Sequence, residues 1–301
     1  MSSLTLIPSP PHHNLSSHAH LHRYPHPPMA IIRHLNLPHL NLRHHRRRYL
    51  SVAAALRQDT SVWTQAPLSE VQPAAEELFH VSIDVSDSPD LVASHTRPGQ
   101  YLQLRLPDAE KPAFLAIASS PSVSASKGQF EFLVKSVAGS TAELLCGLRR
   151  GDVVELSQVM GRGFDIGQIS PPEEYPTVLI FATGSGISPI RSVIESGFSA
   201  RKRSDVRLYY GARNLRRMAY QDRFKEWESS GVKVVPVFSQ PDDRWEGEHG
   251  YVQVAAFARA KQTYNPLSTG ALLCGQKQMA EEVTSLLVAN GVSMEKILKN
   301  F

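Results

Sequence analysis

The chain has very little cysteine and no long apolar run. Only Cys146 and Cys274 occur among its 301 residues, which excludes a four-cysteine iron–sulfur centre or a disulfide framework within the chain. Such scarcity is typical of a reducing compartment. No apolar run approaches the roughly 20 residues that a membrane span requires, and the histidines have no fixed ligand spacing. We therefore predict neither a membrane span nor a metal site.

Acidic residues are absent from the first 58 positions, which hold seven arginines and ten histidines among many serines and prolines. This composition is typical of a plastid or mitochondrial transit peptide. The arginines at 46–48, followed by Val-Ala-Ala-Ala at 52–55, resemble a stromal processing site. We predict that residues 1–57 are a disordered transit peptide for the chloroplast stroma, with the mitochondrion as the alternative. A disordered tail or a nucleic-acid-binding arm is the other interpretation of the composition.

The basic character of the chain comes from this leader. Cleavage near Ala53 would remove six of the 32 lysines and arginines, leaving 26 against 28 acidic residues and a net charge near −2. A mature protein with this charge would not be basic. The charge therefore argues against nucleic acid as a partner.

The first half of the remaining chain shows the pattern of short strands. Six runs rich in β-branched and aromatic residues lie between residues 61 and 164, separated by turn residues. From Leu102 to Leu106 apolar and polar residues alternate, which gives this strand one buried face. One short helical segment, residues 140–148, interrupts the strands. The pattern predicts an antiparallel six-stranded β-barrel over residues 58–168.

After Pro171 and Pro172 the pattern changes to strands that alternate with helices. Such alternation implies a parallel, doubly wound sheet, and we predict an α/β nucleotide-binding domain over residues 173–301. Strands are expected at 177–183, 205–212, 232–239 and 271–275, with helices after the first, second and last of them and a shorter helix at 252–261.

The most informative stretch is residues 177–197. A short apolar run ends in a turn where Gly184 and Gly186 allow a tight bend and a close approach of the backbone to a ligand. Ser188 is expected to cap the following helix, and Pro189 fits its first turn. A strand, a glycine turn and a helix start together make a site for a diphosphate. The spacing is G-x-G-x-x-P, without the third glycine of the dinucleotide fingerprint, so a tight connection without a ligand is the alternative.

A barrel followed by a nucleotide-binding sheet resembles the ferredoxin–NADP reductase superfamily over residues 61–301, and within it a plant group of oxidoreductase-like "fruit proteins". The resemblance implies two cofactors, FAD on the barrel and NAD(P) on the sheet. It depends on motifs that occur in the family's order: Pro98-Gly99-Gln100-Tyr101, Ile117-Ala118-Ser119-Ser120, Gly139-Ser140-Thr141, Gly151-Asp152, Gly161-x-Gly163-Phe164, Thr183 to Pro189, Tyr210-Gly211-Ala212-Arg213, and Cys274-Gly275 with Met279.

The resemblance assigns candidate residues to each cofactor. Those for FAD are Ile117, Ala118 and Ser119, the helix start at Gly139, Ser140 and Thr141, and the final residue, Phe301. Those for the nicotinamide dinucleotide are Thr183, Gly184, Ser185, Gly186, Pro189, Gly275 and Met279, with Arg213 on a 2′-phosphate or a ribose hydroxyl, Tyr220 against the adenine and Cys274 as the catalytic neighbour of the nicotinamide.

Each of these assignments has a structural alternative. The Gly139 turn also reads as an ordinary Ser/Thr helix cap. Tyr220 falls on an apolar helix face with Phe224 and Trp227, and Cys274 at a strand end is commonly a small buried hydrophobe. Phe301 could simply pack as part of a C-terminal tail.

The sequence departs from the family at the flavin signature R-x-Y-S. Here the four positions read Ala113, Phe114, Leu115 and Ala116, so the arginine, the tyrosine and the hydroxyl are missing. Loss of a charge-assisted pair costs about 1.5 to 3 kcal/mol of affinity. Two hypotheses follow: a flavin-dependent NAD(P)H oxidoreductase that passes electrons to an external acceptor, such as a separate iron–sulfur protein, or an NAD(P)-binding module or complex subunit with a weakened flavin site and no turnover.

Overall fold

The computed structural model describes residues 62–107, 109–257 and 264–300. The predicted transit peptide, the end of the helix expected at 252–261 and Phe301 all lie outside the described residues. The predicted domain boundaries at 57/58, 168 and 173 stay predictions. The boundary at 57/58 lies outside the described residues, 168 lies within the 3₁₀ turn at Ile166–Ile169, and 173 lies between that turn and the strand at Thr177–Thr183.

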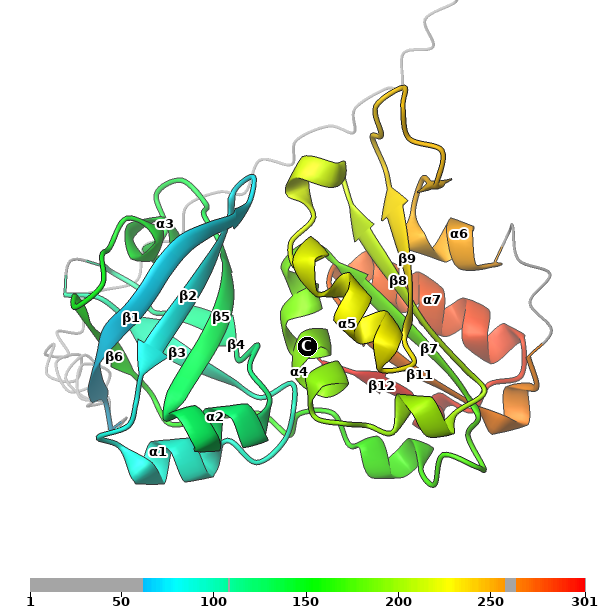
Figure 1. Ribbon diagram of the computed structural model, residues 1–301, viewed down its shortest axis with the longest axis horizontal. Helices are drawn as coiled ribbons and strands as arrows, with labels where there is room; N and C mark the ends of the chain where they lie inside the picture. Colours follow the sequence, from blue (N-terminus) through cyan, green and yellow to red (C-terminus); the bar gives the residue numbers. More distant parts are fainter. Residues whose placement is uncertain (1–61, 108, 258–263, 301) are drawn as a thin grey trace, which may run out of the picture. The chain divides into compact units, whose positions relative to one another are not determined.

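The first domain is the predicted six-stranded antiparallel sheet, which is confirmed (Figure 1). Its strand order is β4-β3-β6-β1-β2-β5, and an isolated bridge between Ile117 and Phe132 joins the two edges. The alternating leucines Leu102 and Leu104 are fully buried inside it. The strands are β1 (Thr64–Ala75), β2 (Leu78–Asp84), β3 (Tyr101–Arg105), β4 (Ala113–Ala116), β5 (Gln129–Lys135) and β6 (Val153–Leu156).

The prediction of a single helix among these strands is wrong. Besides α3 (Thr141–Cys146), the barrel carries α1 (Pro89–Ser94) and α2 (Pro121–Lys127). Both begin with a serine followed by a proline at the first helical position, which is a helix start signal. Neither helix could be predicted from periodicity, because six or seven residues are too few to show a helical period.

The second domain is a six-stranded parallel sheet of order β10-β9-β8-β7-β11-β12. Four of its strands were predicted; the two at the edges are too short for a sequence pattern. The strands are β7 (Thr177–Thr183), β8 (Asp205–Ala212), β9 (Lys233–Phe238), β10 (Glu248–His249), β11 (Thr269–Cys274) and β12 (Ile297–Lys299). The 3₁₀ turns of the chain are η1 (Ile166–Ile169), η2 (Gly184–Gly186), η3 (Ala200–Lys202), η4 (Leu215–Arg217), η5 (Gln221–Arg223), η6 (Pro266–Ser268) and η7 (Met294–Lys296).

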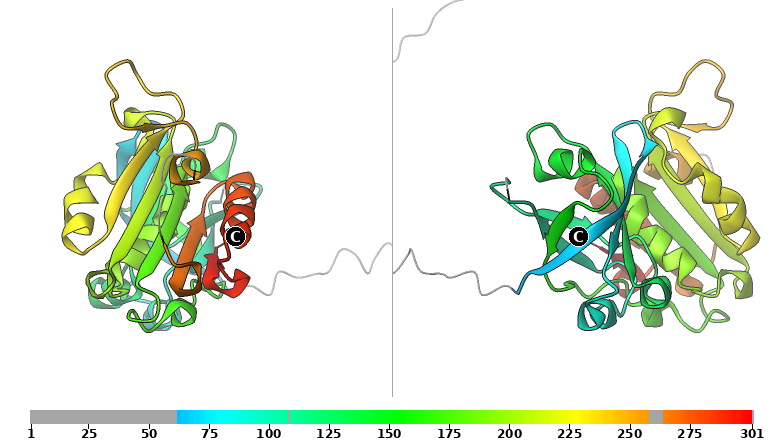
Figure 2. Two further views of the ribbon diagram at one scale, coloured as in Figure 1. Left: turned by 90° about the vertical axis from the view of Figure 1, so that its right-hand side faces the viewer. Right: turned by 60° about the vertical axis from the view of Figure 1, so that its left-hand side comes forward.

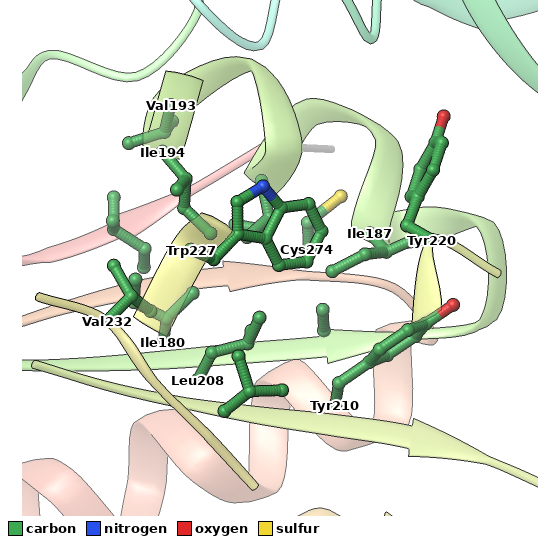
Figure 3. Packing of buried hydrophobic residues seen from close by; sticks show 14 of the residues in the cluster. Ile180, Ile187, Val193, Ile194, Leu208, Tyr210, Tyr220, Trp227, Val232 and Cys274 are labelled. Carbon is green, nitrogen blue, oxygen red and sulfur yellow. The ribbon is translucent and has the colours of Figure 1, made fainter. Parts of the chain in front are cut away.

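Helices cover both faces of this sheet (Figure 1; Figure 2). On one face Trp227 packs against the strands and against the first helix after the glycine turn (Figure 3). On the other face Phe181 stacks on Tyr209 with ring centroids 5.3 Å apart. Because neighbouring residues of β7 are buried on opposite faces, the strand reads as a continuous apolar run. The helices are α4 (Ile187–Glu195) and α5 (Phe224–Ser229) on the first face, α6 (Val252–Phe257) and α7 (Lys277–Ala289) on the second.

The helix α4 also contacts the barrel. Ser188 donates a hydrogen bond to the carbonyl of Ala116 (3.2 Å), and Ser192 donates one to the carbonyl of Ser119 (2.9 Å). The predicted capping role of Ser188 is therefore wrong: the N-cap is Gly186, two residues earlier, and the helix begins at Ile187. The Ser188 hydroxyl binds across the domain interface instead.

Candidate functional site

Two cavities meet at the turn between β7 and α4. The first has a volume of about 1220 Å³ and lies between β4, the start of α3 and the end of β11. The second has a volume of about 550 Å³ and extends over the end of β8 and the start of α7. Thr183, Gly184 and Ser185 line both. Small-molecule pockets usually measure about 300 to 1,000 Å³, so together the two cavities have room for dinucleotides.

At the predicted glycine turn, the ends of β7 and β11 and the residues that follow them pack closely together. A Cβ on Gly186 would lie 2.5 Å from the carbonyl oxygen of Cys274, and one on Gly275 would lie 2.0 Å from Oγ1 of Thr183. Gly184 has φ +53° and faces open space. The described side chains do not cap the start of α4, and the N–H of its first residue, Ile187, donates to the carbonyls of Gly184 and Ser185. The backbone that lines the cavity here is that of the turn before the helix, residues 184–186. This arrangement suits a diphosphate.

Cys274 lines the first cavity at the end of β11. Its thiol donates to the carbonyl of Asn300 at 3.6 Å. Burial raises the pKa of this thiol to about 12, and the backbone N–H of Gly275 only partly offsets that effect. The side chain is therefore a neutral thiol at physiological pH and suits a neighbour of a bound ring better than a nucleophile.

Two other predicted nicotinamide-site residues line the second cavity. Arg213 is exposed just past β8, next to Ser239 and Gln240. No described side chain forms a hydrogen bond or an ion pair with its guanidinium. Met279 of α7 is buried but also lines this cavity.

Tyr220 does not lie where the family resemblance predicted. It lines neither cavity and is 7% exposed, with the guanidinium carbon of Arg191 5.0 Å from its ring centroid. Burial raises the pKa of its phenol to about 12. Nor does it belong to the helix that was expected to carry it, because its φ of +60° places it before η5. The ring of Tyr220 instead packs against that of Trp227, which agrees with the structural alternative, apolar packing, given for this residue.

On the barrel side, Ile117, Ala118 and Ser119 are also not brought to the cavity. All three are 0% exposed, and they line neither cavity. The Ser119 hydroxyl is 2.9 Å from that of Ser124 and accepts a hydrogen bond from the N–H of Glu131. The segment supports the barrel wall from inside.

The start of α3 lines the first cavity, as predicted, but its polar groups have partners. The N–H of Gly139 donates to the carboxylate of Glu143 (2.7 Å), while the hydroxyl of Ser140 accepts from the N–H of Glu143 (3.3 Å). This is a variant of the capping box in which Glu143 bonds the N–H of the residue before the N-cap, Gly139, in place of the N–H of Ser140 itself. Thr141 donates to the carbonyl of Lys111 (2.5 Å). A diphosphate at this turn would have to displace the Glu143 carboxylate.

Phe114 is a cavity residue that sequence reasoning missed. In the β3–β4 ladder, Leu115 pairs with Leu102 and Ala113 with Leu104. Cross-strand partners share a face, so Leu115 and Ala113 turn toward the barrel core. Phe114 turns the other way, is 64% exposed and lines the cavity. Its ring lies 6.2 Å from that of Tyr101, which also lines the cavity.

The first cavity fits FAD through contacts other than R-x-Y-S. Phe114 and Leu144 offer exposed apolar surface, and Lys111 and Lys135 supply positive charge at the lining. In the described sheet β4 is an edge strand beside β3, joined to β5 by the bridge that follows it at Ile117, so the backbone groups at the Ala113 end of β4 are available to a ligand. Apolar, cationic and backbone groups are what a flavin dinucleotide requires.

The described residues contain no group of three or more His, Cys, Asp or Glu side chains placed to hold a metal ion. No helix in the described part of the chain is long and apolar enough to cross a membrane.

Known proteins are similar to this chain in sequence and in fold. Residues 180–285 match the family model of the oxidoreductase NAD-binding domain. The chain is 53% identical to the fruit protein pKIWI502 of Actinidia deliciosa, over 95% of this chain and 93% of that protein. It is 25% identical to the xylene/toluene monooxygenase electron transfer component XylA of Pseudomonas putida, over 74% of this chain and 61% of that protein.

Among solved structures, a ferredoxin NADP⁺ reductase from Neisseria gonorrhoeae with bound FAD and NADP aligns with a TM-score of 0.64 at 17% identity. The alignment covers 79% of this chain and 99% of that one, and it shows that the two share a fold. The family is shown by the kiwi fruit relative, which is 53% identical over 95% of this chain, and the match to the oxidoreductase NAD-binding domain agrees with it. This chain belongs to the ferredoxin–NADP reductase-like superfamily of FAD- and NAD(P)-binding oxidoreductases.

Proposed function

We propose that the protein is an NAD(P)H-dependent flavin oxidoreductase. FAD, when bound, supplies the chemistry that accepts a hydride and passes electrons to an external acceptor. The observation that carries the proposal is that the two cavities share the lining residues Thr183, Gly184 and Ser185 and are therefore adjacent. A nicotinamide ring that enters past this turn comes within the same cavity as Phe114.

The residues of the chain would mainly bind and orient the two cofactors. The turn before α4, with Gly184, Ser185 and Gly186, would hold the diphosphate of the nicotinamide dinucleotide. The small, neutral Cys274 side chain would leave room for the nicotinamide ring. The bond from Ser188 to the carbonyl of Ala116 ties the nucleotide turn to the flavin strand (3.2 Å), so the two sites keep a fixed separation.

The names of two relatives support an external electron acceptor. One is the electron transfer component XylA, already described, and another, 28% identical over 67% of this chain, is the reductase component of propane 2-monooxygenase from Mycolicibacterium goodii. The chain spans only 57% of the latter protein. We propose a separate iron–sulfur protein as the acceptor, because two cysteines cannot hold such a centre within this chain.

A second candidate is an NAD(P)-binding module or complex subunit without turnover. The contact between the Glu143 carboxylate and the N–H of Gly139 favours it, because the carboxylate occupies the donor that a flavin diphosphate would use. The absence of an arginine at position 113 points the same way.

Purification of the full chain separates the two candidates. The oxidoreductase is expected to be yellow or to take up added FAD, to be reduced by NAD(P)H without oxygen, and to reduce an artificial acceptor. A colourless protein that binds NAD(P)H but takes up no FAD would establish the binding module and reject the enzyme.

Within that experiment, Phe114→Ala is expected to weaken FAD binding five- to hundredfold. Loss of an aromatic stacking surface costs about 1 to 3 kcal/mol, and the ring is too exposed for its removal to change the free energy of unfolding by more than about 0.5 kcal/mol. Quenching of flavin fluorescence measures the affinity. Phe114→Tyr is the matched control and should bind as the wild type does; equal affinity of all three proteins would contradict the role of Phe114.

We further propose that the acid-free leader directs import into the chloroplast. Its composition and the plant origin of the kiwi fruit relative support this proposal. A fluorescent protein fused behind residues 1–57 should enter the stroma; accumulation in mitochondria would favour the alternative organelle.

A further inference from the structure

The turn between β1 and β2 brings two glutamates of the barrel to the nucleotide cavity. Glu76 and Glu77 join the two strands and line the second cavity together with Arg213 and Arg217. The N–H of Glu76 donates to the carbonyl of Arg216 (2.8 Å), which docks the turn on η4. The flavin domain therefore supplies part of the wall of the nicotinamide dinucleotide cavity.

Both glutamates bind Arg217. Its Nη1 and Nη2 each lie 2.9 Å from an oxygen of Glu77, a bidentate pair, and Nη2 lies 3.1 Å from Oε1 of Glu76. The hydrogen bond that Arg217 donates to Glu76 and the charges of both carboxylates raise the pKa of Arg217. Both terminal nitrogens of this guanidinium thus donate hydrogen bonds to carboxylates, and the two glutamates compensate its positive charge.

Arg213 differs from Arg217 in this respect. It lies in the same cavity, yet no carboxylate of the described chain pairs with it. The charged residues that line the cavity are three cations, Lys135, Arg213 and Arg217, and three acids, Glu76, Glu77 and Glu282. A 2′-phosphate adds close to two negative charges to a dinucleotide. The phosphate could therefore pair with Arg213, whereas Arg217 is already paired with two carboxylates.

We propose that Glu76 and Glu77 determine nucleotide specificity by holding Arg217 away from the 2′-phosphate, which limits the preference for NADPH over NADH that Arg213 provides. This inference rests on the proposed function, because it takes the second cavity to bind a nicotinamide dinucleotide. It adds that the hairpin of the flavin domain sets the degree of discrimination.

The test measures binding of NADP⁺ and NAD⁺ to the full chain by calorimetry, so that turnover is not needed. In the double variant Glu76→Gln, Glu77→Gln, the ratio of the two dissociation constants should shift about tenfold toward NADP⁺, the size of one charge-assisted hydrogen bond. The shift should shrink at high salt, because the cavity is open to solvent. Glu76→Gln alone keeps the bidentate pair and should give a smaller shift, which covers the case in which the double variant folds poorly.

Three further variants decide the cause. Adding Arg217→Ala to the double variant should abolish the gain, because the freed arginine supplies it; a gain that persists would overturn the proposal. Arg213→Ala should lose the preference for NADP⁺ that the wild type shows. Glu228→Gln, an exposed position on α5 that lines neither cavity, is the matched control and should leave the ratio unchanged.

The outcomes for the two proposals differ. If the wild type binds neither nucleotide, the proposed function and the specificity role both fail. If it binds both, and the ratio is unchanged in the double variant, only the specificity role fails.

Discussion

Replacing Arg191 by methionine is expected to lower the free energy of unfolding by about 3 to 5 kcal/mol, the usual cost of removing one partner of a buried ion pair. The Arg191 side chain is 2% exposed in α4 and pairs with Glu131 of β5 and with Glu195 one helical turn away. Methionine would leave both carboxylates with much of their burial and without their main cation. Urea denaturation at pH 7 measures the loss.

The pH dependence of this loss follows from Glu131. Burial alone raises the pKa of Glu131, but the charge and the hydrogen bond of Arg191 outweigh burial and lower it below its ordinary value of 4.5. In the wild type this carboxylate stabilises the fold above pH 4.5 and loses that contribution as the pH falls through its lowered pKa.

Without Arg191 the sign reverses, because burial then raises the pKa of the folded-state carboxyl above 4.5. The destabilisation of the variant by its unpaired, buried carboxylate therefore decreases as the pH falls through that raised pKa. The difference between wild type and variant should therefore be smaller at pH 4 than at pH 7.

An exposed arginine provides the control for this prediction. Arg201→Met removes two hydrogen bonds to the carbonyl of Ser229 at the surface and should cost less than about 1 kcal/mol. Equal losses for the two variants, or a loss for Arg191→Met that does not change with pH, would contradict the buried pair as the cause.

This buried pair is also a part of the structure that the sequence could not predict. Arg191 and Glu131 are 60 residues apart in the chain and belong to different domains, and periodicity reports only on neighbours within one element. The six strands of the first sheet and the four central strands of the second were predictable because their apolar residues alternate or run continuously. The edge strand β10 has two residues and carries no such pattern.

The candidate site was predictable where a backbone requirement shows in the sequence, as at Gly184 and Gly186. It was less predictable where the register of two strands decides which side chain meets the cavity. The family signature directed attention to Leu115, whereas the pairing of Leu115 with Leu102 turns it into the core and leaves Phe114 outside. The alternation of β3 shows which of its own residues are buried. Extending this to β4, and so to Phe114, requires the register of the two strands.

Gly186→Ala is expected to abolish detectable binding of the nicotinamide dinucleotide, at a loss of a hundredfold or more. The backbone φ of −62° suits alanine, so space alone decides the effect. The added Cβ would lie 2.5 Å from the carbonyl oxygen of Cys274, against 3.4 Å for ordinary contact, so the turn and the end of β11 must part by about 0.9 Å. Misplacement of a binding element by about 1 Å costs on the order of a hundredfold.

The substitution should also destabilise the protein, by about 1 to 3 kcal/mol, because the neighbouring atoms are backbone and cannot rotate away. Calorimetric titration with NADP⁺ and thermal melting measure the two effects. Gly147→Ala is the matched control: it also has a helical backbone conformation, and its Cβ would come no closer than 3.4 Å to another atom. If Gly186→Ala bound NADP⁺ within threefold of this control, the close contact at the β7–α4 turn would not be what forms the nucleotide site.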